Sequence, residues 1–86
     1  MNRQIIVFYR NYPTELDSYI RSDGFMTLVR DGVHPIGTIK KSAPRLTILT
    51  KSLSPARDPD RIRGLFNLLD ELVARGQILL YREGGL

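Results

Sequence analysis

Residues 58–76 read DPDRIRGLFNLLDELVARG and carry the clearest structural signal in the chain. Asp58 can act as an N-cap, Pro59 occupies a first position that tolerates proline, and Gly76 can end a helix. Apolar residues recur every three or four positions and so share one broad helical face: Ile62, Leu65, Phe66, Leu69, Leu72 and Val73. The pattern predicts an amphipathic helix over residues 59–75.

A glycine interrupts the polar face of this predicted helix. Gly64 in a helix interior costs about 1 kcal/mol relative to alanine. Two explanations are open for it: the bare backbone admits a close approach by a partner, or the glycine is simply tolerated.

The segments outside this helix are short runs of β-forming residues with one further helix. Residues 4–10 are apolar on both strand faces, which is typical of a strand in the interior of a sheet. Thr14 can cap a short helix that ends at Gly24. Further strands are predicted over residues 25–30, 33–41, 45–50 and 77–82.

Two turn signals organise these strands. Asp31-Gly32 stands between two β-prone runs and predicts a tight hairpin. Pro35 cannot donate a backbone hydrogen bond and indicates an edge strand. The resulting order β-α-β-β-β-α-β predicts one domain over residues 1–86, a two-layer α+β sandwich of ferredoxin-like or related type, with a loose tail at 83–86.

Composition excludes several functional classes. The 86 residues include no Cys and one His, which excludes disulfides, thiolate zinc sites, iron–sulfur clusters and multi-histidine metal sites. The longest apolar run, residues 5–9, is far shorter than the ~20 residues of a membrane span. We therefore expect a cytoplasmic protein with no cofactor, no metal and no membrane partner.

Positive charge is concentrated in residues 40–63. This window holds seven Lys and Arg against Asp58 and Asp60, a net charge of +5, whereas the rest of the chain is at −1. Clustered cations favour phosphate backbones, since each neutralised phosphate releases a counterion. Solvated charge and an acidic protein partner are the alternatives. The predicted contacts with DNA or RNA are Lys40, Lys41, Arg45, Lys51, Arg57, Arg61 and Arg63.

The strands are apolar on both faces, although a two-layer fold covers only one. One set, assigned to the helix side, is Ile5, Val7, Tyr9, Ile48, Ile78 and Leu80. The opposite face would then expose Ile6, Phe8, Met26, Leu28, Leu49, Leu79 and Tyr81. Exposed apolar patches larger than a few hundred Å² are rare on monomers, so this face predicts a partner. A second copy in a homodimer, another protein, or bases stacked on Phe8 and Tyr81 could cover it.

No catalytic motif is present in the sequence. Asp58 and Asp60 are explained by the start of the long helix, and Asp70 and Glu71 are neighbours on its solvent face. A small metal-independent ribonuclease that uses His34, Arg45 and Tyr81 is a third option, based only on size and charge.

The sequence therefore predicts a small non-catalytic binding module. The leading hypothesis is contact with nucleic-acid phosphates through the basic segment. The alternative is a regulatory or inhibitory protein, of the kind that phages encode, which docks on a larger protein through its apolar sheet face with arginines at the rim.

Overall fold

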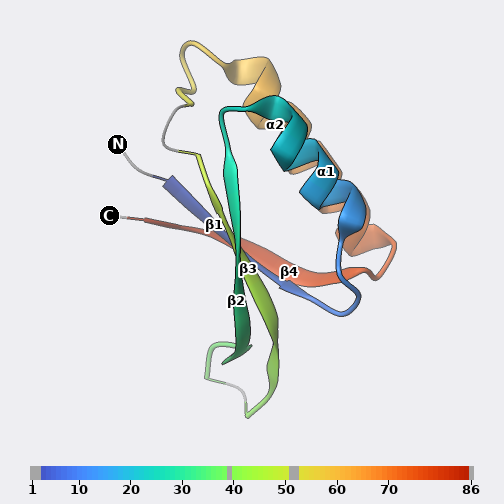
Figure 1. Cartoon of the computed structure of the whole chain (residues 1–86). Coiled ribbons are helices and arrows are strands. Elements are labelled where there is room, and N and C mark those ends of the chain that lie inside the picture. Colours follow the sequence, from blue (N-terminus) through green and yellow to red (C-terminus); the bar gives the residue numbers. More distant parts are fainter. Residues whose placement is uncertain (1–2, 39, 51–52, 86) are drawn as a thin grey trace.

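The chain forms an α+β fold with a four-stranded antiparallel sheet and two helices. The computed structural model describes residues 3–38, 40–50 and 53–85. Within them lie β1 (Arg3–Tyr9), α1 (Thr14–Asp23), β2 (Thr27–Pro35), β3 (Ser42–Leu49), α2 (Pro59–Ala74) and β4 (Ile78–Gly85). The strand order is β2-β3-β1-β4, and both helices lie on the same side of the sheet (Figure 1).

Strand β1 occupies the interior position that its two apolar faces predict. It pairs with β3 on one edge and with β4 on the other, both antiparallel. Strand β2 is an edge strand, as Pro35 predicts.

The core fills the space between the helices and one face of the sheet. Cross-strand partners Ile5 and Ile48, and Val7 and Leu46, stack along its centre. The helices contribute fully buried leucine and isoleucine side chains: Leu16, Ile20, Leu65, Leu69 and Leu72. Each such side chain contributes about 1.5–3 kcal/mol by leaving water.

The hairpin predicted at Asp31-Gly32 is wrong, because the chain continues through both residues as one strand. The favoured two-residue turns need positive φ at their first residue, and Asp31 does not have it. Instead Gly32, at φ 81°, follows a β-bulge in which Asp31 is the extra residue. The chain reverses after Pro35, where the Ile36 N–H donates to the Lys41 carbonyl oxygen (2.9 Å). Two predicted strands are therefore one, and the element order is β-α-β-β-α-β.

The predicted loose tail is also wrong for residues 83–85. They complete β4, with Glu83 opposite Ile5 and Gly84 opposite Gln4. This pairing satisfies backbone groups on the second edge of β1 that would otherwise lack partners. Residue 86 lies outside the described residues.

Helix α2 ends as predicted, but the predicted side-chain caps do not form. Gly76 has φ 78°, and the N–H groups of Gly76 and Gln77 donate to the carbonyls of Val73 and Leu72, a Schellman ending. Neither α1 nor α2 has a side-chain N-cap bond. The Asp58 carboxylate accepts the N–H of a preceding residue, Ser54, at 3.1 Å.

Gly64 has a packing role inside the molecule. The Tyr19 side chain of α1 lies directly over it, and a Cβ at position 64 would stand 2.7 Å from the Tyr19 hydroxyl oxygen. That hydroxyl donates to the Arg61 carbonyl oxygen at 3.4 Å. The close approach expected of a partner is therefore made by α1 itself.

We expect Gly64→Ala to destabilise the protein although alanine favours helices. The new Cβ forces Tyr19 to move, and overpacking of this kind costs about 1–3 kcal/mol, more than the gain of about 1 kcal/mol in helix propensity. Tyr19→Phe removes the clashing oxygen, so Gly64→Ala should cost less in that background. Urea unfolding of the two single variants and the double variant measures this coupling. Additive effects would contradict it.

Candidate functional site

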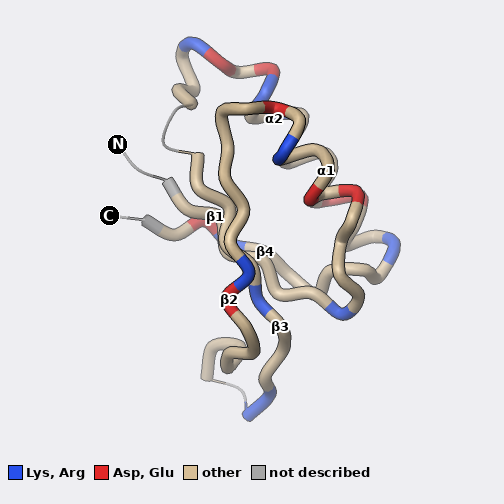
Figure 2. Tube along the Cα trace, viewed as in Figure 1, with Lys and Arg blue, Asp and Glu red and all other residues tan. Residues whose placement is uncertain are grey.

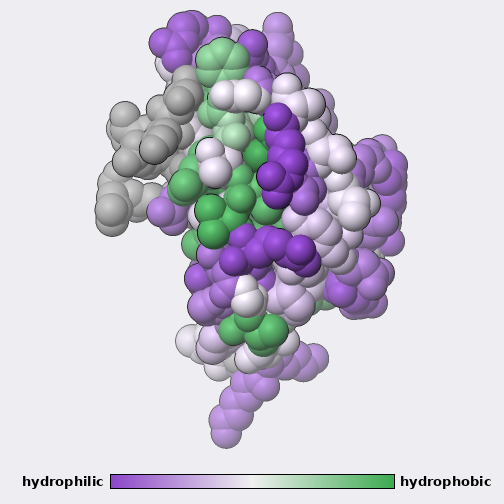
Figure 3. Space-filling model, in the orientation of Figure 1, coloured by the Kyte–Doolittle hydropathy of each residue, from purple (hydrophilic) through white to green (hydrophobic). Residues whose placement is uncertain are grey.

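The sheet face opposite the helices is covered by neither of them. The cross-strand register places one residue set on it: Gln4, Ile6, Phe8, Thr27, Val29, Arg45, Thr47, Leu49, Leu80 and Arg82. Val29 is 43% and Leu80 is 36% exposed, and Ile6 and Leu49 are half-buried. Figure 3 shows green side chains gathered over the strands, to the left of the helices, with purple side chains around them. Apolar and polar residues are interspersed on the face: Val29 and Leu80 lie on the edge strands β2 and β4, whereas Arg45 and Thr47 lie on the interior strand β3.

Three predicted members of the open face lie elsewhere. Met26, Leu28 and Tyr81 pack with the helix-side core. Leu28 is the cross-strand partner of Ile48, a core residue, and Met26 precedes β2. The sequence contains no signal for the register between strands, which decides these positions.

A second β-bulge, in β4, explains why Tyr81 lies on the helix side of the sheet and Leu80 on the open face. Tyr9 pairs with Ile78 and Phe8 with Leu80, so Leu79 is an extra residue in β4. Strict alternation would place Ile78 and Leu80 on one face. The bulge separates them: Ile78 stays in the core, and Leu80 lies on the open face beside Phe8. Leu79 is half-buried at the bulge.

The two aromatic rings proposed for base stacking are not available on this face. Phe8 lies on it but is only 1% exposed. Tyr81 faces α2, where its ring packs against Phe66 with centroids 5.9 Å apart and its hydroxyl donates to the Asp70 carboxylate. That hydrogen bond, with burial, raises the pKa of Tyr81 to about 12.

The Tyr81–Asp70 contact predicts a late-titrating tyrosine. Because the folded pKa lies above the ordinary value of about 10, its stabilising effect is fully present below pH 10 and is lost as pH rises through 12. Ultraviolet titration of the four tyrosines should show one last step that Tyr81→Phe removes and Asp70→Asn moves towards lower pH. Identical curves for the wild type and Asp70→Asn would contradict this.

The bulge at Asp31 builds a polar cluster on the open face. The Asp31 carboxylate accepts hydrogen bonds from the Thr47 hydroxyl and from Arg45 Nε, the latter at 3.3 Å. His34 Nε2 lies 2.6 Å from the Asp31 carbonyl oxygen. Tyr81 is on the other face of the sheet, so His34, Arg45 and Tyr81 do not form the group that the ribonuclease option needs.

Charge is divided between the two layers of the molecule. The helical segments, taken as the helices with the residues that flank α2 (residues 14–23 and 57–75), contain five Lys and Arg against seven Asp and Glu, whereas the rest of the chain contains eight against two. The tube of Figure 2 shows red and blue together along the helices and blue at the end of the β2–β3 hairpin. The excess positive charge therefore belongs to the strands and their connections.

Each arginine of the helical segments lies within 4 Å of a carboxylate. Arg61 is the loosest, with Nε 3.9 Å from Asp23 and its guanidinium 3.9 Å from the centre of the Phe25 ring. The other pairs are Arg21–Asp17, Arg57–Asp58, Arg63–Asp60, and Arg75 with both Glu15 and Glu71. These cations are already neutralised within the molecule.

The predicted basic segment is not one surface. Lys40 and Lys41 are exposed at the end of the β2–β3 hairpin, whereas the start of α2, which contains Arg61 and Arg63 and follows Arg57, lies at the opposite end of the molecule (Figure 2). Arg45 lies between them on the open face, bound to Asp31. Lys51 lies outside the described residues.

Besides Arg30, whose guanidinium lies 3.9 Å from the centre of the Tyr12 ring, four exposed cations of the sheet layer have no carboxylate within ion-pair distance among the described residues: Arg10, Lys40, Lys41 and Arg82. Arg10 follows β1, Lys40 and Lys41 end the hairpin, and Arg82 lies on the open face. The sequence-based prediction did not include Arg10 and Arg82, because they lie outside the positively charged segment of residues 40–63.

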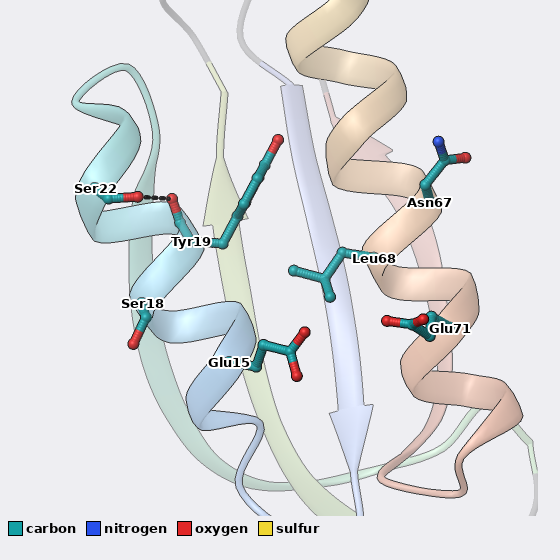
Figure 4. Close-up of a pocket in the computed structure, with 7 residues that line it drawn as sticks. All are labelled: Glu15, Ser18, Tyr19, Ser22, Asn67, Leu68 and Glu71. Carbon is teal, nitrogen blue, oxygen red and sulfur yellow. Dashed lines mark hydrogen bonds between the residues drawn. The ribbon is translucent and has the colours of Figure 1, made fainter.

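A groove between α1 and α2 is the second candidate site (Figure 4). It encloses about 600 Å³ and is lined by Glu15, Ser18, Tyr19, Ser22, Asn67, Leu68 and Glu71. The Arg75 guanidinium bridges Glu15 and Glu71 at 2.9 Å each, so both acidic side chains of the groove are engaged in ion pairs with one cation. Ser22 is also engaged, since its hydroxyl donates to the Tyr19 carbonyl oxygen (3.0 Å). The groove therefore presents few free groups that would select a ligand.

Residues 3–38, 40–50 and 53–85 contain no cluster of three His, Cys, Asp or Glu side chains that could hold a metal ion. In the same ranges no helix has the length and apolar character needed to cross a membrane.

Comparison with known proteins found no match to the chain among protein-family models, curated proteins or solved structures. Function is therefore inferred from charge, exposure and geometry.

Proposed function

We propose that the chain is a non-catalytic module that binds nucleic-acid phosphates through its sheet layer. The single observation that carries this proposal is the division of charge: the strands and their connections hold eight Lys and Arg against two Asp and Glu. The contact surface comprises the end of the β2–β3 hairpin and the open sheet face. It differs from the continuous segment 40–63 by omitting the arginines near α2.

Free cations support this choice of surface. A phosphate that approaches Arg57 or Arg63 is repelled by the carboxylate that each already contacts at about 3 Å. Lys40, Lys41 and Arg82 have no such carboxylate beside them among the described residues. Each phosphate that they neutralise releases a condensed counterion.

Recognition by this surface would be largely independent of sequence. Lysine contacts phosphate as a point charge, and contacts to the backbone position a protein without reading bases. Arg82 can add a bidentate phosphate contact at the edge of the open face.

We further assign the fold to the ferredoxin-like type. Two features support this assignment: the element order β-α-β-β-α-β, and a strand order in which each helix joins strands that are separated by one other strand. Helix α1 joins β1 to β2 around β3, and α2 joins β3 to β4 around β1.

We expect charge reversal at the hairpin to weaken binding more than charge reversal near α2. Lys40→Glu/Lys41→Glu and Arg57→Glu/Arg63→Glu change the net charge equally, so the pair forms a matched test of position. The lysine variant should lose affinity for a DNA or RNA oligonucleotide and reduce the salt slope by about two, whereas the arginine variant should lose less.

Fluorescence anisotropy across a salt series measures both effects, and circular dichroism confirms folding. Equal losses in the two variants would show that only net charge matters. Absence of binding by the wild type at low salt would overturn the proposed function.

A second candidate function is docking on a protein through the open face. The exposed side chains of Val29 and Leu80, beside half-buried Ile6 and Leu49, favour it. The buried core of a protein interface is enriched in apolar side chains of this kind. The partner is either a larger protein that this chain regulates or inhibits, or a second copy of the chain.

A second copy is the partner that can be tested directly. If the open face is a homodimer interface, light scattering should give about twice the chain mass of 9.8 kDa. Val29→Glu/Leu80→Glu should then return the monomer mass while the core stays intact. A wild type that is monomeric at all concentrations would exclude the homodimer.

A further inference from the structure

The outer part of the β2–β3 hairpin stands clear of both helices. Figure 1 shows it extending past the rest of the molecule. Val33 lies on the same face of β2 as Leu28, which packs with the helix-side core, but Val33 is 66% exposed. Its neighbours on that face, Pro35 and Ser42, are exposed as well. Neither helix reaches this part of the sheet, so a two-stranded ribbon projects into solvent.

The projecting ribbon carries positive charge only. Residues 32–44 contain Lys40 and Lys41 and no Asp or Glu. The nearest carboxylate in the sequence, Asp31, lies at the root of the ribbon and is bound by Arg45 and Thr47. The two lysines at the end therefore meet solvent without a compensating acidic group among the described residues of the ribbon.

The root of the ribbon is held in a defined direction. A β-bulge bends its strand and increases the local twist, and the bulge at Asp31 lies where the ribbon leaves the body. The Asp31 carboxylate joins β2 to β3 through Thr47 and Arg45, and the Asp31 carbonyl oxygen contacts His34 Nε2 at 2.6 Å. These bonds tie β2 to β3 at the root of the ribbon.

The described part of the open face, by contrast, lacks the exposed aromatic rings on which single-stranded nucleic acid stacks. Proteins that bind single-stranded nucleic acid stack its bases on exposed aromatic rings. Among the described residues of the open face, Phe8 is the one aromatic, and its ring is buried. A two-stranded β-ribbon, however, has the dimensions that the major groove of B-DNA admits.

We infer that the nucleic acid is double-stranded DNA and that the end of the β2–β3 ribbon enters its major groove. This inference rests on the proposed function. In this arrangement Lys40 and Lys41 contact the phosphates at the edges of the groove. Arg10 and Arg82 lie nearer the body of the sheet, where they would contact the DNA backbone on either side of the groove.

The test compares a short DNA duplex with a single strand of the same sequence at low salt. Fluorescence anisotropy should show at least about tenfold tighter binding of the duplex, a difference of about 1.4 kcal/mol. Val33→Glu, which adds a carboxylate to an exposed position of the ribbon, should weaken duplex binding at least about fivefold. Arg57→Glu/Arg63→Glu is the control for loss of general charge.

The outcomes separate the inference from the proposed function. Equal or tighter binding of the single strand would overturn the duplex inference and leave the proposed function standing. Duplex binding that neither Val33→Glu nor Lys40→Glu/Lys41→Glu weakens would overturn the role of the ribbon. Absence of binding to either nucleic acid would overturn both proposals. Val33→Asn, which removes the apolar side chain without adding charge, shows whether a loss in Val33→Glu is electrostatic.

Discussion

The fold depends on the pairing of β1 along both of its edges. β3 and β4, which come from distant parts of the chain, both align antiparallel to it. Because β3 intervenes between β1 and β2, and β1 between β3 and β4, each helix must cross over another strand. Both helices then cover the same face, which carries Ile5 and Val7. The other face stays open, and the β2–β3 hairpin grows out beyond the helices (Figure 1).

Two bulges then decide which side chains the open face presents. The extra residue in β4 moves Leu80 out of the core and brings Tyr81 against α2. The extra residue in β2 lets the chain run through Asp31 into the projecting ribbon, with the Asp31 carboxylate bound to its neighbours on β3. Backbone irregularities of one residue each therefore set both the composition of the face and the direction of the ribbon.

The division of charge between the layers follows from their geometry. In a helix, side chains three or four residues apart are neighbours, so acidic and basic residues close in sequence can pair, as Arg63 and Asp60 do. Strand residues need a partner from another strand at the same level and on the same face. The strands and connections contain only Asp31 and Glu83 as acids, and Asp31 is bound to Arg45. Among the described residues of this layer, Arg10, Lys40, Lys41 and Arg82 therefore have no carboxylate within ion-pair distance.

By itself the sequence determined what depends on neighbours along the chain: the amphipathic helix α2 with its end at Gly76, the second helix before Gly24, and the interior position of β1. It also determined the total positive charge. Only the tertiary structure decided the features that depend on pairing between distant segments. These include the single strand in place of a hairpin at Asp31, the strand at residues 83–85, the packing of Tyr19 over Gly64, and the separation of Lys40 and Lys41 from the arginines of α2. The physical reason is that a strand's register and bulges are set by its partner strands, whereas a helix closes its own hydrogen bonds within four residues.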